Sequence, residues 1–594
     1  MRTMIAHHGT NAPRSPSRFR GAGLLAARLG LATLATAGIG AGATSCSLLV
    51  ATDSDQCKVD ADCIGQLAGR LCQSGVCVAN TVVCKANADC NPAPVGPANK
   101  ICRKFTDATK NKCVSLTSAL CTTVASTKPD GYLDDNAFIF GAILPTVGPD
   151  AAYGKVVEDS IKLALDDFHT TNGIPAASGS GTRPLVLVGC NDGPDETQTD
   201  VAANYLIDQV GVPAIIGYPF SGNTITVATD VTIPKGVLLF SSAATSTGIT
   251  TLDDHDLVWR TSPPDTIQAK ALNLFYPTIE ATARTRYPMI PLSQIKVAII
   301  HTSDAYGAGL ATALEAQLKF NGKAATQQSG PGGNYTRINY GSSTAPDTTS
   351  ITKSIAFGAH ITFVFGFNES VDPIFKGIEA GWQTQTDMHR SMWLLADGSE
   401  VGVLWNKAVT TEDERQRIIG SVPGVNKNYK PYADFTTAWN ASKYAMDGSP
   451  DTLGTAGAYD ITYMLAYSAV AVGTDPMTGA NLVKFGLRNM EPTMATPHPQ
   501  QVHIGPLTIM DTFPFLQKRT RIDIEGTSGH LDFDVAGEAI SDIQIWCLPK
   551  LTAMSGSTGM VADPAINSGL YYDSGAQTIA GAVDPKCELT LTKP

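Results

Sequence analysis

The chain has 594 residues, enough for several domains or for one large two-lobed domain with additions. Its 43 basic and 54 acidic side chains give a net charge of −11, which argues against nucleic acid as a partner. Hydrophobic residues make up 43% of the chain and charged residues 16%, so the composition is that of a globular protein with few charges.

The first 46 residues have the pattern of a signal peptide rather than of a folded domain. An uncharged apolar run, Leu29–Ala43, ends in the small residues Ala43-Thr44-Ser45 before Cys46. This end resembles a bacterial lipobox, and the resemblance implies that Cys46 carries a lipid anchor. The alternative is an ordinary cleaved signal peptide with Cys46 as a spare thiol. A basic region precedes the run and holds Arg14, Arg18, Arg20 and Arg28.

The anchor would be the chain's one attachment to a membrane. Leu29–Ala43 is short for a stable membrane span, and no other stretch is long and apolar enough. Without Cys46, the 13 cysteines become an even number, which fits disulfides in an oxidising compartment. We therefore expect the protein in the periplasm or cell envelope, as a membrane-anchored lipoprotein.

Residues 47–121 form a cysteine-rich module that looks duplicated. The sequence CKVDADC at Cys57–Cys63 is echoed by CKANADC at Cys84–Cys90. So short a segment buries little core, so disulfides would have to hold it. Zinc is the alternative, but the five-residue gaps are longer than in most zinc knuckles. The pairing within the module stays open; each repeat continues with two more cysteines, first Cys72 and Cys77, then Cys102 and Cys113.

After a polar linker at 122–135, strand and helix patterns alternate. Apolar runs predict strands at Ala137–Ile143 and Leu185–Val188, and helical periodicity predicts helices near Tyr153–Phe168 and Thr197–Val210. This alternation is typical of a doubly wound parallel sheet. It repeats after residue 262, with further strands at Lys296–Ile300, Ile361–Phe365, Met392–Leu395 and Arg417–Val422.

The segment Val212–Thr247 lies at the centre of this pattern. Two apolar strands, Val212–Ile216 and Val237–Phe240, each end in a loop of small hydroxyl residues. Ligands of open α/β sheets bind at the carboxyl ends of strands, and such loops can hold a carboxylate. The alternative is that these serines and threonines only cap helices.

From about Asn136 to Pro549 the chain resembles the leucine/isoleucine/valine-binding proteins of ABC importers. The matching pieces include AFIFGAILPTVGPDAAYGK, LVLVGCNDGPDETQTD, the Val212–Thr247 segment and VAIIHTSDAYGAGLATALEAQLK. The resemblance implies an α/β protein of the type I periplasmic-binding fold, in which two doubly wound parallel-sheet lobes enclose a ligand cleft. It implies three crossings between lobes, near Ser262, Val422 and Thr527. The lobes would be 136–262 with 423–526, and 263–422 with 527–550, followed by a tail at 551–594.

The resemblance also implies which residues bind the ligand. Ser221 and Thr224 match the positions that hold its carboxylate, and Ala243 and Thr245 match further contacts in the loop after the next strand. Tyr306 matches an aromatic residue of the second lobe that closes over the ligand. The remaining matches are Asp397 for the ligand ammonium, with Glu400 as the alternative, and Tyr459 for an aromatic wall. The usual Pro-Glu-Gly around the acidic residue is absent here.

Four cysteines outside the module suggest two further disulfides. Cys190 is the one cysteine between Cys121 and the C-terminal region, where Cys547 and Cys587 lie. We expect Cys121 to pair with Cys190, and Cys547 with Cys587.

No enzyme motif stands out: the sequence lacks a Gly-x-Ser-x-Gly elbow, a His-Glu-x-x-His pair and a P-loop. We expect no cofactor and no metal. The resemblance implies a solute-binding protein that closes on a small polar ligand, an amino acid or a related amide or carboxylate, with an ABC permease as its partner. The alternative is a ligand sensor or envelope scaffold that uses the same fold without transport.

Overall fold

The computed structural model describes residues 70–73, 76–79, 83–92, 99–193, 196–291, 293–383, 390–400, 405, 408–490, 499–549, 552–553, 560–561 and 565–587. The chain divides after Asn80 into two compact units. In the first unit, β1 (Arg70–Gln73) and β2 (Val76–Ala79) form an antiparallel hairpin that places Cys72 opposite Cys77. The predicted signal peptide and Cys46 lie outside the described residues.

The second repeat of the cysteine-rich module belongs to the larger unit. Its strands β3 (Lys100–Arg103) and β4 (Lys112–Ser115) form an antiparallel hairpin. Disulfides join Cys84 to Cys102 and Cys90 to Cys113, so this half of the module is disulfide-bonded as expected. The Tyr205 hydroxyl donates to the Ser115 carbonyl at 2.6 Å, which holds the repeat against the first lobe.

The first lobe is built on a six-stranded sheet in the order β12, β11, β10, β6, β9, β5. Neighbouring strands are parallel except for β5 and β9, which are antiparallel. The strands are β5 (Cys121–Ser126), β6 (Phe138–Leu144), β9 (Leu185–Asn191), β10 (Ala214–Ile216), β11 (Leu238–Ser241) and β12 (Val258–Arg260).

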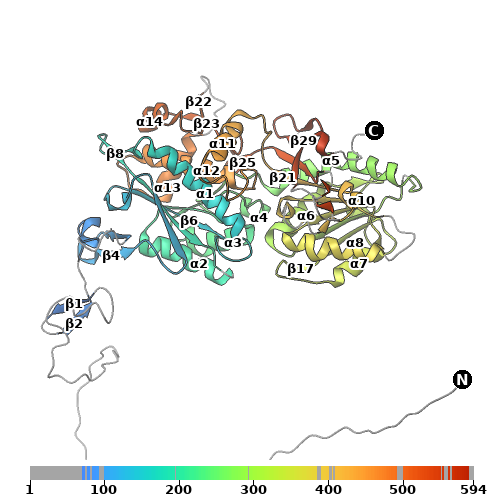
Figure 1. Cartoon of the computed structure of the whole chain (residues 1–594), viewed down its shortest axis with the longest axis horizontal. Helices are drawn as coiled ribbons and strands as arrows, with labels where there is room; N and C mark the ends of the chain where they lie inside the picture. Colours follow the sequence, from blue (N-terminus) through green and yellow to red (C-terminus); the bar gives the residue numbers. More distant parts are fainter. Residues whose placement is uncertain are drawn as a thin grey trace, which may run out of the picture. The chain divides into compact units, whose positions relative to one another are not determined.

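Helices cover both faces of this sheet because its central strands are apolar on both sides (Figure 1). Phe138 and Phe140 of β6 pack towards α1 (Ala151–His169) and α12 (Thr455–Val472). Ile143 of the same strand faces α2 (Glu196–Asn204) and α3 (Ser221–Val227). The sheet therefore buries two separate apolar layers, as a doubly wound lobe requires.

The second lobe has an eight-stranded sheet in the order β16, β13, β19, β20, β21, β26, β29, β30. The first five strands are parallel, and the last three add antiparallel pairs. The strands are β13 (Val297–His301), β16 (Tyr335–Asn339), β19 (Ile361–Phe365), β20 (Met392–Leu395), β21 (Ile418–Pro423), β26 (Ile543–Cys547), β29 (Ile566–Asp573) and β30 (Thr578–Gly581).

This sheet is also covered on both faces. Alternate residues of β13 point to opposite faces of the sheet. Val297 and Ile299 pack with α5 (Asp265–Arg286) and α6 (Ala305–Gln317) on one face. Ala298 and Ile300 belong to the opposite core layer, as does Ile378 of α8. Among its helices are α7 (Thr349–Phe357), α8 (Lys376–Gln383) and α10 (Glu412–Gln416).

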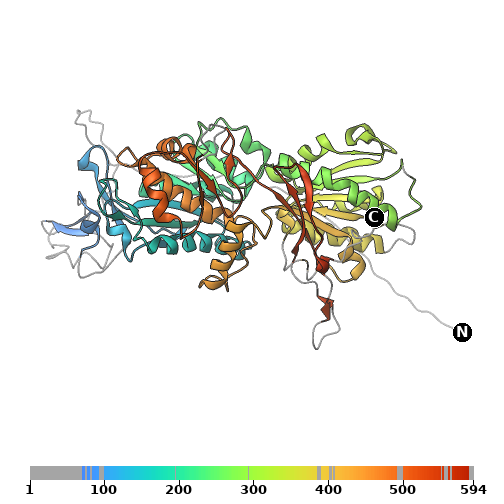
Figure 2. The same ribbon diagram turned by 90° about the horizontal axis from the view of Figure 1, so that it is seen from above.

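Two segments differ from the sequence prediction. The linker at 122–135 contains most of β5, which pairs with β9 as an edge strand. The predicted C-terminal tail contains two strands, β29 and β30, which extend the second sheet (Figure 2). Tyr572 of β29 is buried against Ile543, so this strand has its own apolar anchor. Both segments are rich in Ser, Thr, Gly and Ala, which hid their strand character.

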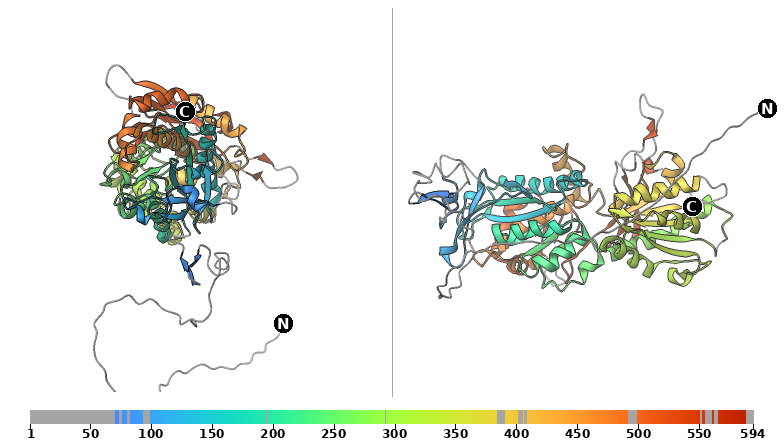
Figure 3. Two further views of the ribbon diagram at one scale, coloured as in Figure 1. Left: turned by 90° about the vertical axis from the view of Figure 1, so that its left-hand side faces the viewer. Right: turned by 90° about the horizontal axis from the view of Figure 1, so that it is seen from below.

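Residues 500–525, part of the segment 423–526 that was predicted to belong to the first lobe, form a strand–helix–strand unit. Strands β22 (Gln500–His503) and β23 (Ile522–Glu525) pair in parallel on either side of α14 (Ile509–Gln517) in the sequence. Phe513 and Leu516 of α14 join the core that contains α12, and both helices are drawn in shades of orange in Figure 3. This unit therefore belongs to the core of the first lobe.

The remaining elements are short helices and hairpins. They are α4 (Thr247–Thr250), α11 (Lys430–Ala441), α13 (Gly479–Asn481), β7 (Ile174–Pro175), β8 (Thr182–Arg183), β14 (Lys319–Phe320), β15 (Lys323–Ala324), β17 (Gly341–Ser342), β18 (Ala345–Pro346), β24 (Asp532–Phe533), β25 (Ala539–Ile540), β27 (Thr552–Ala553) and β28 (Met560–Val561). Among the helices of the described residues, none combines the length and the apolar character needed to cross a membrane.

Asp460 of α12 fixes the third segment that passes between the lobes. One carboxyl oxygen of this fully buried residue accepts from the amide and the hydroxyl of Thr527, both at 2.8 Å. The other accepts from the amide and hydroxyl of Ser528, at 2.7 and 2.6 Å. Burial raises the pKa of Asp460 to about 6 despite these four bonds. Beyond this contact, the chain enters β26 of the second sheet.

The structure joins Cys121 to Cys190 and Cys547 to Cys587, the two pairs expected from the sequence. Replacing both Cys547 and Cys587 with serine should lower the free energy of unfolding by about 2–4 kcal/mol, because the bridge restrains the unfolded chain. Urea unfolding followed by tryptophan fluorescence measures this change. Thiol titration should show that Cys121 and Cys190 stay oxidised, and an unchanged unfolding midpoint would contradict the assignment.

Candidate ligand-binding site

The loops after β10 and β11 meet at the carboxyl edge of the first sheet. Ser221 begins α3, and its hydroxyl oxygen accepts from the amides of Thr245 and Ser246, at 3.3 and 3.1 Å. Both neighbouring loops are thus joined through one serine. Since its oxygen accepts two bonds, the Ser221 hydroxyl hydrogen remains available to donate to a ligand.

Thr224, in α3, and Ala243, in the loop after β11, have different roles. The Thr224 hydroxyl donates to the carbonyls of Tyr218 and Phe220, both at 3.0 Å, so its hydrogen stabilises its own loop. Ala243 is buried beside Ser241, whose hydroxyl donates to the Tyr218 carbonyl at 2.5 Å. Ser221 is therefore the clearest hydroxyl donor of the sequence-predicted residues in these loops.

Asp397 and Tyr306 meet at the facing edge of the second sheet. Tyr306, at the start of α6, donates its hydroxyl to Asp397 Oδ1 at 2.8 Å and accepts from the Gly398 amide at 3.1 Å. Gln268 of α5 donates to the same carboxyl oxygen at 2.8 Å. Both side-chain bonds fall on Oδ1, which leaves Oδ2 for a further partner. Burial raises the pKa of Asp397.

Asp265 adds a second carboxyl group that the sequence did not indicate. It is the first residue of α5, it is fully buried, and neither carboxyl oxygen has a hydrogen-bond donor within 3.5 Å among the described residues. Burial, followed by the charge of Asp397, raises its pKa far above the usual range, and the Thr245 side chain offsets part of this rise. A buried carboxyl without a donor is rare and favours a site that is completed by another molecule.

The two lobes touch at this site. The Ser246 hydroxyl of the first lobe donates to the Ala305 carbonyl of the second at 2.8 Å. Phe220 and Phe367 pack edge to face across the lobes, with ring centroids 5.4 Å apart. Tyr153 of α1 packs against Phe220, and Tyr306 against Phe367, at 6.2 and 5.1 Å. A row of four aromatic rings thus spans from one lobe to the other.

The surroundings of these rings are acidic. Burial raises the pKa of Asp150 and, with the charges of Asp451 and Asp397, raises that of Glu400 to about 8. Within the described residues, no lysine or arginine nitrogen lies within 4.0 Å of Asp150, Asp265, Asp397 or Glu400. A cleft with several such carboxyl groups favours a ligand with a positively charged group.

Tyr459 lies apart from this group. It is buried in α12, where it packs against Phe435, and its hydroxyl donates to Asp167 of α1. Its hydroxyl therefore belongs to the core of the first lobe. Tyr153, Asp265 and Gln268 are the residues that sequence reasoning missed, and the polar positions at the first turns of α1 and α5 were the available signal.

A comparison with protein families matches residues 139–501 to the family described as periplasmic binding protein. This match covers more than half of the chain and agrees with the two sheets and the facing loops. The chain belongs to the periplasmic binding protein family. Members of this family are binding proteins rather than enzymes.

Curated relatives match parts of the chain. The Leu/Ile/Val-binding protein homolog 3 of Brucella melitensis biotype 1 is 27% identical over 231 residues, which is 38% of this chain and 54% of the relative. The Leu/Ile/Val/Thr-binding protein of Salmonella typhimurium is 30% identical over 175 residues, covering 30% of this chain and 42% of the relative. The chain spans about half the length of the curated relatives it matches.

A solved structure extends the likeness in fold to most of the chain. The leucine binding protein LivK of Thermotoga maritima superposes with a TM-score of 0.50 at 17% identity, covering 72% of this chain and 98% of LivK. At that identity the likeness concerns the fold, and it confirms the type I periplasmic-binding architecture expected from the sequence.

Replacing Ser221 with alanine should destabilise the ligand-free protein by about 1–3 kcal/mol, because two buried amides lose their acceptor. Differential scanning calorimetry measures the shift. Ser180, exposed in a turn, provides the control, and its alanine variant should change stability by less than about 0.5 kcal/mol. Equal melting temperatures for the Ser221 and Ser180 variants would contradict the role assigned to Ser221.

Proposed function

We propose that this protein is an extracytoplasmic solute-binding protein that closes on an amino acid, or on a related amide or carboxylate, and presents it to an ABC importer. The arrangement of Ser221 and Asp397 carries the proposal. Ser221 accepts from the Ser246 amide, Ser246 contacts Ala305 of the other lobe, and the next residue, Tyr306, donates to Asp397. This chain of contacts supports a site where a hydroxyl donor and a carboxyl acceptor would receive the two charged ends of an amino acid. The curated relatives named for Leu/Ile/Val binding support the same ligand class.

Each charged end of the ligand would meet a different lobe. The ligand carboxylate would accept from Ser221, near the start of α3 and the loop with Ala243 and Thr245. The ligand ammonium would donate to the free oxygen of Asp397, whose other oxygen is held by Tyr306 and Gln268. This pairing removes the unfavourable burial of an isolated carboxyl group, so binding energy is gained only when both lobes are in contact.

The two lobes would close because the ligand needs contacts with both of them. A ligand that binds the closed form more tightly than the open form shifts the equilibrium towards closure. The contact from Ser246 to Ala305 and the aromatic pair Phe220–Phe367 would form in the same step. In the proposed importer, the closed protein is the form that the permease recognises.

The N-terminal segment completes the proposal. A lipid on Cys46 would tether the binding lobes to a membrane and keep them next to a permease. The cysteine-rich module favours the alternative function, a sensor or scaffold, because disulfide-bonded modules of this size suit contacts with other macromolecules. A permease and an ATPase encoded beside this gene would favour import, whereas a neighbouring kinase or wall-synthesis gene would favour the alternative.

A thermal-shift screen of the full chain against amino acids, amides and small organic acids tests the proposal. A ligand at 100 times its Kd should stabilise the closed protein by about 2.7 kcal/mol and raise the melting temperature. We expect at least one amino acid to do so. A screen in which no compound of the three classes shifts the melting temperature would overturn the proposed function.

Asp397→Asn supplies the matched variant for that screen. It keeps the shape of the side chain and removes the charge, so an amino acid should bind about tenfold to a hundredfold more weakly, as for a charged hydrogen bond. Asp434→Asn, which removes an exposed carboxylate paired with Lys430, should leave the affinity unchanged.

A further inference from the structure

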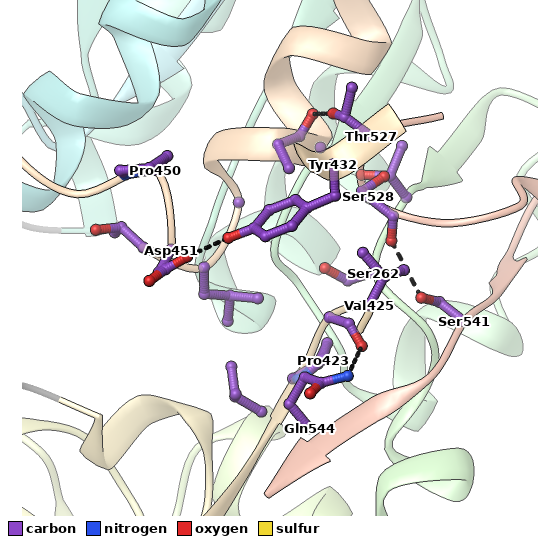
Figure 4. A pocket seen from close by; sticks show the side chains of 18 of the residues that line it. Ser262, Pro423, Val425, Tyr432, Pro450, Asp451, Thr527, Ser528, Ser541 and Gln544 are labelled. Carbon is purple, nitrogen blue, oxygen red and sulfur yellow. Dashed lines mark hydrogen bonds between the residues drawn. The ribbon is translucent and has the colours of Figure 1, made fainter. Parts of the chain in front are cut away.

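A pocket of about 90 Å³ lies where the chain passes between the lobes (Figure 4). A single buried water needs only about 10–15 Å³ on this measure, so the pocket can hold a larger group. Its walls come from all three crossing segments and from the start of α12. We call it the hinge pocket; its lining includes Ser262, Pro423, Val425, Tyr432, Thr527 and Gln544.

Two buried hydroxyl groups in the hinge pocket lack partners. The side chains of Ser242 and Thr261 are 2% and 1% exposed, and neither hydroxyl has a hydrogen bond among the described residues. Both residues line the pocket. Buried hydroxyls are nearly always bonded in native proteins, so two unbonded ones at one cavity indicate a polar guest.

The pocket also holds a carboxyl group with no basic partner. Glu400 lines it, and no lysine or arginine nitrogen of the described residues lies within 4.0 Å of its carboxyl oxygens. The second acidic residue of the pocket is different: Asp451 is bonded by Lys427 at 3.2 Å and by the Tyr432 hydroxyl, which Figure 4 shows. Lys427 also lowers the pKa of Glu400, but its ammonium group is paired with Asp451, so Glu400 has no ion-pair partner of its own among the described residues.

Opposite these polar groups the wall is apolar. Val422, Val425, Leu453 and Trp546 line the pocket, and methylene groups pack well against such side chains. A positive charge at the end of a short alkyl chain would therefore match both the apolar wall and the carboxyl group.

The hinge pocket lies beside the proposed amino acid site. Glu400 follows Asp397 by three residues, on the same turn after β20. At Gly454, which lines the pocket, an added Cβ would lie 3.0 Å from the Ser242 hydroxyl and 3.3 Å from the Tyr153 hydroxyl. Tyr153, the first ring of the aromatic row, therefore lies beside Gly454 at the border of the pocket.

We propose that the hinge pocket binds an alkylammonium group, with Glu400 as its counter-charge and the hydroxyls of Ser242 and Thr261 as further acceptors. This rests on the proposed function and narrows its ligand to compounds with a second ammonium group, such as a basic amino acid. The ligand would then touch all three crossing segments, and its side chain would stabilise the closed hinge directly.

Isothermal titration of the full chain with L-lysine and L-norleucine tests this inference, because the two differ only in the terminal ammonium. The wild type should bind L-lysine at least tenfold more tightly. Glu400→Gln should abolish the difference, whereas Asp434→Asn should keep it. Glu400→Gln replaces a buried carboxyl group that has no ion-pair partner among the described residues with an amide of the same shape, so its melting temperature without ligand should not fall below that of the wild type.

The pH dependence gives an independent readout. Glu400 is faced by Asp397, Asp451, Tyr432 and Lys427, and burial with the two acidic charges raises its pKa to about 8. The carboxyl group must release this proton to pair with an ammonium group, so the preference for L-lysine over L-norleucine should grow from pH 6 to pH 8. In Glu400→Gln the ratio of the two affinities should not change with pH.

The outcomes separate the inference from the proposed function. Equal binding of L-lysine and L-norleucine by the wild type would overturn the inference and leave amino acid binding in place. Binding of 1,5-diaminopentane without either amino acid would support the pocket and contradict the amino acid site. Failure of all three compounds to bind would overturn the inference, and water alone would then occupy the pocket.

Discussion

The four hydrogen bonds that Asp460 accepts from Thr527 and Ser528 hold the third crossing segment against α12. This contact constrains the rest of the larger unit. The first lobe supplies α12, and the chain beyond Ser528 supplies β26 to the second sheet. Because Asp460 is buried, its carboxylate is stable there only while both residues donate. The crossing therefore has one preferred position, and the facing loops of the two sheets meet in a defined register.

The charges of the cleft follow from that register. The loop after β20 brings Asp397 and Glu400 to the junction, and α5 brings Asp265. In the part of the chain that the structure describes, no lysine or arginine nitrogen lies within 4.0 Å of these three carboxyl groups. Burying carboxyl groups in this way is unfavourable in the empty protein, which is why burial raises their pKa values. A positively charged ligand reverses the effect, because it restores the charged form of each group that it touches. The raised pKa values of these carboxyl groups therefore favour the binding of a positively charged ligand.

The sequence predicted the buried central strands better than the strands at the edges of the two sheets. Ile361–Phe365 and Met392–Leu395 were predicted with the bounds that the structure shows, because both are uninterrupted apolar runs buried on two faces. Most of the strand Cys121–Ser126 was predicted as part of the linker 122–135, since an edge strand needs apolar residues on one face only. Residues 566–581 were read as a tail for the same reason, although Tyr572 is buried.

The candidate site shows a similar division. Family resemblance indicated Ser221, Asp397 and Tyr306, and the structure brings Asp397 and Tyr306 into contact. Tyr459 was expected in the cleft, but its hydroxyl bonds Asp167 in the first lobe. Asp265 could not be predicted, because its burial depends on α5 docking between two loops far away in the sequence. The local sequence shows that a position carries a carboxyl group. Whether that group has a hydrogen-bond partner depends on the tertiary packing around it.

Small-angle X-ray scattering of the full chain, with and without the amino acid that raises its melting temperature most, tests the central claim most directly. The account predicts a smaller radius of gyration when the ligand is bound, because the two lobes close on it. The bound protein should match a scattering curve calculated with Ser246 in contact with Ala305. Identical curves in both states, at saturating ligand, would contradict closure of the lobes around the ligand.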